Sequence, residues 1–304
     1  MNDTSGWCHD LIQRARAAGE SLTIPELRDG IAKLDLATIE ADCVAQNDRW
    51  YSFPAFLLFV TRIDSHELAS FEKQLRTLLD GMSPAARKDL LQLLYTQANA
   101  DVRGHAGRVF DIATRLRTMV AGVECSYDVK NGARDVDIVC HLPAGAVALE
   151  LKAVSDTDDQ LNSFPGFDNL EARLVGTDID ASGRAFLNGL TSKVAPDSKL
   201  HGPWPFAVLG LSISPGPAGM GISADHPSIG WKLDAIAAGT ETRFSWADYP
   251  WFAGVFLFDH TRYSRWVPNP EATPATTLPD EAVDVLVAAF ETRLPIERAI
   301  NGYA

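Results

Sequence analysis

The stretch Asp135–Ala153, DVDIVCHLPAGAVALELKA, predicts two short strands joined by a tight turn. Apolar and polar positions alternate in both halves, and such a period of two is typical of a strand with one face on a core. Pro143 and Gly145 supply residues that favour a turn. The core-facing sets are Val136, Ile138 and Cys140 in the first strand and Val147, Leu149 and Leu151 in the second.

The opposite face of this predicted hairpin carries charged residues in the middle of otherwise apolar strands. They are Asp137 on the first strand and Glu150 and Lys152 on the second. Burying charged groups is costly unless they are paired or bind a metal. The pattern therefore predicts a functional cluster at these three positions.

The turn decides which of these residues lie opposite each other. A two-residue turn at Ala144-Gly145 pairs Pro143 with Ala146. Asp137 then lies opposite Lys152, and Val139 lies opposite Glu150, because summed residue numbers are constant along an antiparallel pair. A three-residue turn would place Asp137 on the other face. We expect the two-residue turn.

A chain of 304 residues is long enough for one large domain or two smaller ones. Interleaved strands and helices predict an α/β (α+β) fold with a mixed sheet flanked by helices. We expect a helical accessory region over residues 1–100 and the main domain over 101–304. The expected helices of the main domain are 104–120, 183–194 and 281–291, and its other strands are 123–129, 206–213 and 252–258.

Within residues 1–100 the apolar spacing is helical and no catalytic pattern occurs. Pro25 indicates one helix start, and Ser83-Pro84 indicates another. The apolar run 53–60 is too short to span a bilayer and predicts a buried helix. We expect this region to serve as an accessory or contact region, through which a homodimer or a protein partner would form.

Composition limits the function classes. No apolar run reaches the length of a membrane span, and the N-terminus MNDTSGWCHD has no signal-peptide pattern. The four cysteines form no CxxC pair, which favours reduced thiols and a cytoplasmic location. The net charge of −13 is unusual for a nucleic-acid binder, which normally carries a basic surface.

Charge is, however, unevenly distributed. The predicted helix 104–120 is basic and carries Arg108, Asp111 and Arg115 on one face, whereas residues 155–181 form an acidic predicted loop. The same pattern is also expected for an ordinary row of solvent-exposed ion pairs on a helix surface. The helix 183–194 adds Arg184 and Lys193.

A helix with an acid, a strand, a strand with Asp137, and then Glu150-Leu151-Lys152 on the next strand resembles the restriction-endonuclease-like, or PD-(D/E)XK, nuclease superfamily. The resemblance covers about residues 104–154, with a continuation through 183–194 and 206–213. The helix acid of that pattern is usually Glu, and Asp111 stands at the matching position here.

The resemblance implies a restriction-endonuclease-like core and a metal-dependent endonuclease, a hydrolase of phosphodiester bonds. It implies Asp137, Glu150 and Asp111 as ligands of Mg²⁺ or Mn²⁺, and Lys152 as the group that orients water or stabilises charge. Arg108, Arg115, Arg184 and Lys193 would contact nucleic-acid phosphates, with DNA expected rather than RNA. A part in prokaryotic defence is a further implication.

The alternative function is a catalytically silent interaction or regulatory protein that retains the same fold. The acidic composition favours this alternative, whereas the presence of Asp137, Glu150 and Lys152 favours the enzyme.

Overall fold

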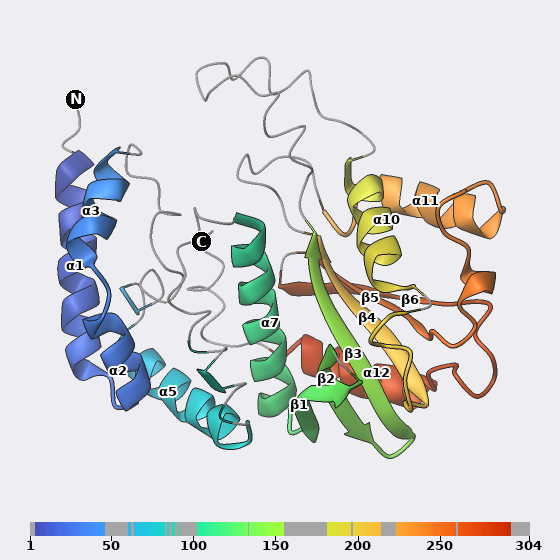
Figure 1. The fold of residues 1–304 in the computed structure, drawn as a ribbon, viewed down its shortest axis with the longest axis horizontal. Helices are drawn as coiled ribbons and strands as arrows, with labels where there is room; N and C mark the ends of the chain where they lie inside the picture. Colours follow the sequence, from blue (N-terminus) through green and yellow to red (C-terminus); the bar gives the residue numbers. More distant parts are fainter. Residues whose placement is uncertain are drawn as a thin grey trace. The chain divides into compact units, whose positions relative to one another are not determined.

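The computed structural model describes residues 4–45, 60–61, 64–82, 84, 87–88, 91, 102–132, 134–154, 181–195, 197–213, 223–259 and 261–292 (Figure 1). The chain divides into two compact units, one of Met1–Val120 with Arg293–Ala304 and one of Ala121–Thr292. The predicted acidic loop and most of the apolar run 53–60 lie outside the described residues. Among those that are described, no helix has the length and apolarity needed to cross a membrane.

The described elements of the first unit are helices. They are α1 (Thr4–Ser21), α2 (Pro25–Ala32), α3 (Leu36–Ala45), α5 (Ser65–Asp80) and α7 (Val102–Val120). Pro25 stands at the start of α2, where its missing N–H is not needed. Asp64 caps α5 by accepting a hydrogen bond from the N–H of Glu67 at 2.8 Å.

A buried carboxylate joins two of these helices. Glu72 of α5 accepts hydrogen bonds from the N–H groups of Thr23 and Ile24 at 2.7 and 2.8 Å. Ile24 is the N-cap residue of α2 and Thr23 precedes it, at a point where a helix leaves N–H groups without intrahelical partners. Glu72 thus acts as a capping residue from a different helix.

The second unit contains one mixed sheet of six strands in the order β1-β2-β3-β4-β5-β6. The strands are β1 (Cys125–Asn131), β2 (Arg134–Leu142), β3 (Gly145–Val154), β4 (Phe206–Ile213), β5 (Gly254–Asp259) and β6 (Arg262–Pro268). Strands β1 to β3 are antiparallel neighbours, β4 and β5 run parallel to β3, and β6 is antiparallel to β5. The predicted α/β class with a mixed sheet is therefore confirmed.

Helices cover both faces of this sheet (Figure 1). Helix α10 (Ala181–Lys193) connects β3 to β4 and lies with α11 (Pro227–Ala237) over one face, while α12 (Asp280–Phe290) lies on the other. Phe290 of α12 makes edge contacts with Phe256 and Phe258, which alternate on β5 with the residues facing α10.

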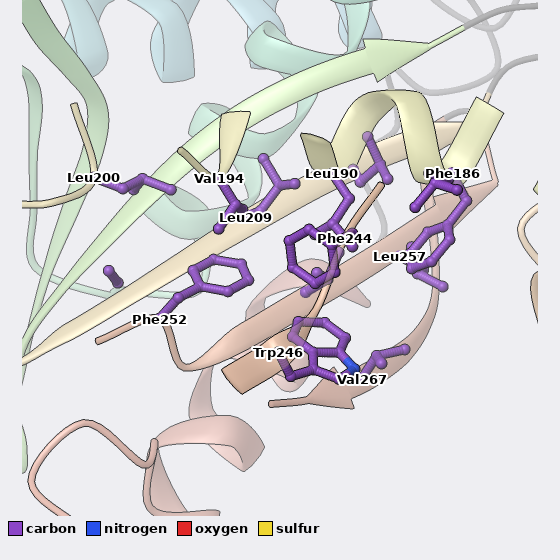
Figure 2. Close-up of a cluster of buried hydrophobic side chains, with 14 of the residues drawn as sticks. Phe186, Leu190, Val194, Leu200, Leu209, Phe244, Trp246, Phe252, Leu257 and Val267 are labelled. Atoms are coloured by element: carbon purple, nitrogen blue, oxygen red, sulfur yellow. The ribbon is translucent and has the colours of Figure 1, made fainter. Parts of the chain in front are cut away.

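The core between α10 and the sheet is built from aliphatic and aromatic side chains (Figure 2). Its residues include Phe186, Leu190 and Val194 from α10 and its end, Leu209 and Leu257 from the sheet, and Phe244, Trp246 and Phe252 from the segment before β5. The central strand β4 is buried along its whole length, as parallel strands covered on both faces usually are.

The predicted register of the central hairpin is wrong by two residues. The turn is Pro143-Ala144, closed by the pair Leu142↔Gly145, and Val139 lies opposite Ala148 instead of Glu150. The reason is the turn chemistry, because proline is favoured at the second position of a β-turn and glycine at the fourth. The sum of paired numbers stays odd, so Asp137 still shares a face with Glu150.

Three elements of the second unit were not predicted from the sequence, namely α11, the short 3-10 helix η2 (Trp246–Asp248) and β6. The other predicted elements of this unit occur with ends shifted by at most two residues. The predicted helix 104–120 is observed as α7 (Val102–Val120). Contacts within the chain assign α7 to the first unit. The predicted domain boundary after residue 100 stays a prediction.

Helix α10 approaches the sheet closely at Gly189, where an added Cβ would lie 2.5 Å from Leu211 Cδ1 and 3.1 Å from Val154 Cγ1. We expect Gly189→Ala to lower the free energy of unfolding by about 1–3 kcal/mol, because overpacking forces the helix and sheet apart. Urea unfolding of the purified chain measures this.

Gly230 of α11 is the matched control, since nothing lies within 4 Å of its added Cβ. Gly230→Ala should raise stability by up to about 1 kcal/mol through helix propensity alone. Equal effects of the two substitutions would contradict the close approach of α10.

Candidate functional site

Two carboxylates lie on neighbouring strands of the sheet, on the face that α10 covers. Asp137 is on β2 and Glu150 on β3, each one residue beyond the strand pair Ile138↔Leu149. Glu150 also lies beside Leu209 of β4 in the register. The strands thus hold two acids at the edge of an apolar layer.

Glu150 is buried, with 1% of its surface exposed. Its Oε1 accepts a hydrogen bond from Lys193 Nζ at 2.5 Å. Its Oε2 lies 2.7 Å from Lys199 Nζ, an ion pair, but accepts no hydrogen bond of favourable angle from the described residues. One oxygen of Glu150 is therefore anchored, and the other faces a cation.

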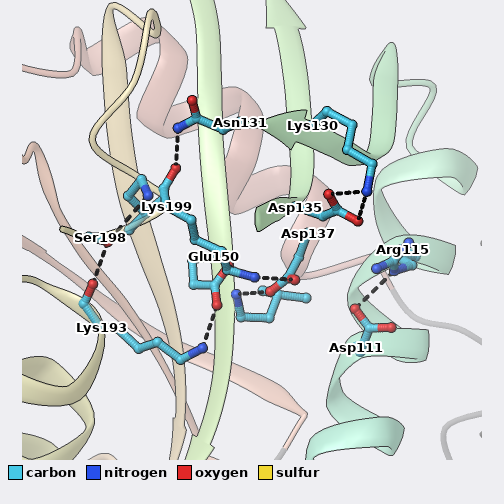
Figure 3. Close-up of polar contacts among 12 residues, drawn as sticks. Asp111, Arg115, Lys130, Asn131, Asp135, Asp137, Glu150, Lys193, Ser198 and Lys199 are labelled. Carbon is cyan, nitrogen blue, oxygen red and sulfur yellow. Dashed lines mark hydrogen bonds and ion pairs between the residues drawn. The ribbon is translucent and has the colours of Figure 1, made fainter. Parts of the chain in front are cut away.

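Asp137 repeats this arrangement. Its Oδ2 accepts a hydrogen bond from the backbone N–H of Leu151 at 2.7 Å, which fixes the carboxylate against β3. Its Oδ1 lies 3.1 Å from Lys199 Nζ. The ammonium group of Lys199 consequently bridges the two carboxylates (Figure 3).

The segment that carries Lys199 is tied to the hairpin of β1 and β2. Asn131 Nδ2 donates to the carbonyl of Lys199 at 2.7 Å, and Arg134 Nη1 donates to the carbonyl of Asp197 at 3.0 Å. Leu200, which follows Lys199, is buried in the core. These contacts hold the backbone so that the lysine side chain reaches the carboxylates.

Lys193 stands in the last turn of α10, where a cation is favoured by the helix dipole. Ser198 Oγ donates to its carbonyl at 2.6 Å, which links the helix end to the segment of Lys199. The same helix that fills the core thus presents Lys193 to Glu150.

The electrostatics of the cluster favour a shared cation. Burial, together with the nearby Asp137 carboxylate, raises the pKa of Glu150 to about 7, although Lys193 and Lys199 oppose this rise. Burial lowers the pKa of Lys199, but the two carboxylates raise it by more, so its net pKa is above the ordinary value. Lys199 therefore stays charged, and Glu150 gives up its proton with difficulty.

Lys152 lies two residues beyond Glu150 on the same face of β3 and is half-buried. Its neighbour in the register on β4 is Leu211. Asp137 forms a close ion pair with Lys199, and Glu150 forms close ion pairs with Lys193 and Lys199. The sequence indicated none of these pairings. The role of Lys152 in orienting water stays a prediction.

The residues that were predicted to contact phosphates lie in different parts of the structure. Lys193 binds Glu150, whereas Arg184 is half-buried nine residues earlier on α10, about 13 Å away along the helix axis. Arg115 of α7 is 4% exposed and donates to Asp111 at 2.9 Å. The side chain of Arg108 lies outside the described residues.

Asp111 belongs to the first unit, and its place as a third metal ligand stays a prediction. Its pair with Arg115 is largely buried, so the alternative of a solvated surface row does not describe it. Within the described residues, no three acid, histidine or cysteine side chains form a group that could hold a metal.

Asp137 and Glu150 nevertheless suit a magnesium ion. Mg²⁺ is commonly held by one or two carboxylates, with waters and substrate phosphates as the other ligands. The fit rests on Glu150 Oε2, a buried oxygen without a well-directed hydrogen bond, which faces the same point as Asp137 Oδ1. The Lys199 ammonium lies 2.7 Å from Oε2 and 3.1 Å from Oδ1, which is longer than the roughly 2.0–2.1 Å of Mg–O bonds, so both carboxylates would have to move closer to hold a divalent ion between them.

Sequence reasoning missed Lys199 as a member of the cluster. The residue stands in the segment DSKLHGPWPF, which has neither helical nor strand periodicity. The side chain reaches the cluster through a loop whose path depends on Asn131 and Arg134, and no spacing in the sequence indicates it.

Comparisons of this chain with protein-family models, with curated proteins and with solved structures give no match.

The raised pKa of Glu150 predicts a pH-dependent stability. Between about pH 4.5 and about pH 7 the Glu150 carboxyl group holds its proton more tightly in the folded chain than in the unfolded chain. The free energy of unfolding therefore falls as the pH rises through this range. We expect Glu150→Gln to become more stable relative to wild type across this window, by about 3 kcal/mol at most. Urea unfolding at a series of pH values measures the difference.

Asp284→Asn, which removes an exposed carboxyl group on α12, is the matched control for the loss of one acidic side chain. A stability difference between wild type and Glu150→Gln that is the same at every pH would show that the carboxyl group is not destabilised by its surroundings.

Proposed function

We propose that the chain is a Mg²⁺- or Mn²⁺-dependent nuclease that hydrolyses phosphodiester bonds, with DNA as the expected substrate. The observation that carries the proposal is the pair Asp137 and Glu150, each with one oxygen anchored and the other facing the same cation position. A site that selects a divalent ion needs hard oxygen ligands held in fixed positions, and this arrangement supplies two.

The order of elements also supports the proposal. Helix α7, the three strands β1 to β3, helix α10 and strand β4 follow one another, with Asp137 on the second strand and Glu150-Leu151-Lys152 on the third. This is the order on which the resemblance to restriction-endonuclease-like nucleases rests. The parallel pairing of β4 with β3 brings the α10 connection over the carboxylates.

In this proposal Asp137 and Glu150 would hold the divalent cation, which would supply neutralising charge for the scissile phosphate and lower the pKa of a bound water. The N–H of Leu151 and the ammonium of Lys193 keep the two carboxylates oriented toward it. Lys152 orients the water or stabilises the charge that develops on the phosphate. Lys199 balances the charge of both carboxylates in the metal-free chain, and its ammonium group would have to leave this position for them to hold a cation.

Cleavage of nucleic acid tests the proposal. End-labelled single- and double-stranded DNA and RNA are incubated with the full chain and Mg²⁺ or Mn²⁺, and products are resolved on gels. We expect wild type to cut at least one substrate, Asp137→Asn to abolish cutting, and Lys152→Ala to slow it by about 10²–10³.

Lys130→Ala is the matched control, because Lys130 also pairs with an aspartate on β2 but is exposed. Its cleavage rate should equal that of wild type. Cutting that survives Asp137→Asn and Lys152→Ala would place the activity elsewhere, and a wild-type chain that cuts none of the substrates would contradict the nuclease proposal.

One observation favours the second candidate, a catalytically silent interaction protein. Both carboxylates already have lysine partners, so the cluster is close to electrically balanced without a metal. In that case the buried ion pairs would act only in holding β2, β3 and α10 together. The two candidates differ in whether a divalent cation binds.

Calorimetric titration of the apo chain with Mn²⁺ separates them without any substrate. The proposal predicts binding that Asp137→Asn weakens and that Lys199→Met strengthens by roughly tenfold, equivalent to ~1.4 kcal/mol, because a competing ammonium is removed. Lys130→Met should bind as wild type does. Absence of Mn²⁺ binding in both wild type and Lys199→Met would leave the silent protein as the better account.

A further inference from the structure

Two cysteines lie directly opposite each other on neighbouring strands. The register pairs Cys125 of β1 with Cys140 of β2. Their sulfur atoms are 3.3 Å apart, with Cys125 donating a hydrogen bond to Cys140. Cys125 is half-buried, whereas Cys140 is buried. Neither residue belongs to the carboxylate cluster.

The backbone hydrogen bonds define the kind of pair. The N–H of His141 donates to the carbonyl of Glu124 at 2.8 Å, so the pair 124 and 141 is hydrogen-bonded and the next pair, 125 and 140, is not. Residues in a non-hydrogen-bonded pair have Cα atoms about 4.5 Å apart, within the range that a disulfide spans. Closure therefore needs side-chain rotation rather than backbone movement.

We propose that Cys125 and Cys140 are a modification site, at which a small-molecule disulfide oxidises the two thiols to a disulfide across β1 and β2. The inference is independent of the proposed nuclease function. Cys140 lies three residues from Asp137 on β2 and hence on the opposite face of the sheet. The link ties the strands together without touching the carboxylates.

The exchange balances in two steps. The thiolate of Cys125 attacks one sulfur of the small disulfide, which breaks its S–S bond and releases one thiol after protonation. Cys140 then attacks Cys125 Sγ, the new Cys125–Cys140 bond forms, and the Cys140 proton leaves with the second small thiol. Two protein thiols are oxidised and one small disulfide is reduced.

The accessibility of the two cysteines sets the order of these steps. Cys125 is the more exposed and is the group that a small disulfide can reach. Its hydrogen bond with Cys125, together with burial, raises the pKa of Cys140 well above the ordinary value, which keeps that thiol protonated until the mixed disulfide forms beside it. The buried cysteine therefore acts as the resolving thiol.

Oxidised glutathione is the probe. The native full chain is incubated with it, remaining thiols are alkylated, and a tryptic digest is analysed by mass spectrometry without reduction. Cleavage at Lys130 and Arg134 separates the peptides 118–130 and 135–152, each with one of the two cysteines. We expect these two peptides to be joined, with a mass lower by two hydrogens than their sum.

Two variants complete the test. Cys125→Ser should give no joined peptide, and Cys140→Ala should stop at a glutathione adduct on Cys125. The oxidised wild type should also unfold at a higher temperature than the reduced form, because the link closes a loop in the unfolded chain, and Cys125→Ser should lose this shift.

The proposal is overturned by a native wild-type chain whose Cys125 ends as a glutathione adduct or as an alkylated thiol. Linkage of Cys125 to Cys8 or Cys43 instead of Cys140 would overturn it as well. Because the principal measurement uses the unaltered chain, a variant that fails to fold does not change the outcome.

Discussion

One ammonium group shared by the buried carboxylate of Glu150 and the half-buried carboxylate of Asp137 is the interaction on which the candidate site depends. Moving carboxylates out of water costs several kcal/mol each unless an opposite charge and hydrogen bonds replace the solvent. Asp137 and Glu150 meet this condition because each is fixed through one oxygen and shares Lys199 through the other. Loss of the lysine would leave two like charges facing each other in an apolar layer.

The scaffold around the cluster is arranged to keep that ammonium in place. The close approach of α10 at Gly189 brings Lys193 to Glu150, and Asn131 and Arg134 hold the segment that ends in Lys199. Two parts of the second unit that are distant in the sequence, the strands β1 to β3 and the stretch 193–199, therefore converge on one pair of acids. Stability alone does not require these charged groups, because apolar residues of similar size would stabilise the same region equally well.

Much of the fold could be predicted because strong periodic patterns control it. The alternation in Asp135–Ala153 indicated both central strands and the shared face of Asp137 and Glu150, and the apolar run 206–213 indicated β4. The register was missed by two residues because Pro143 belongs inside the turn. Strand β6 was missed because charged and aromatic residues interrupt its alternation.

The partners of the carboxylates could not be predicted in the same way. Lys193 was expected to meet phosphates, but the end of α10 directs it to Glu150, and Lys199 reaches the cluster from an irregular loop. Periodicity says which face a strand residue takes, whereas ion pairs between distant segments depend on the path of loops. Tertiary contacts such as Asn131 to Lys199 set that path.

The most direct measurement is a crystal structure of the chain soaked in Mn²⁺, with anomalous diffraction used to locate the ion. The account predicts an anomalous peak bound by Asp137 and Glu150, at the point between Oδ1 and Oε2 where Lys199 Nζ lies in the metal-free chain, with the lysine side chain displaced. A map in which Lys199 still bridges the two carboxylates and no peak lies beside them would contradict it.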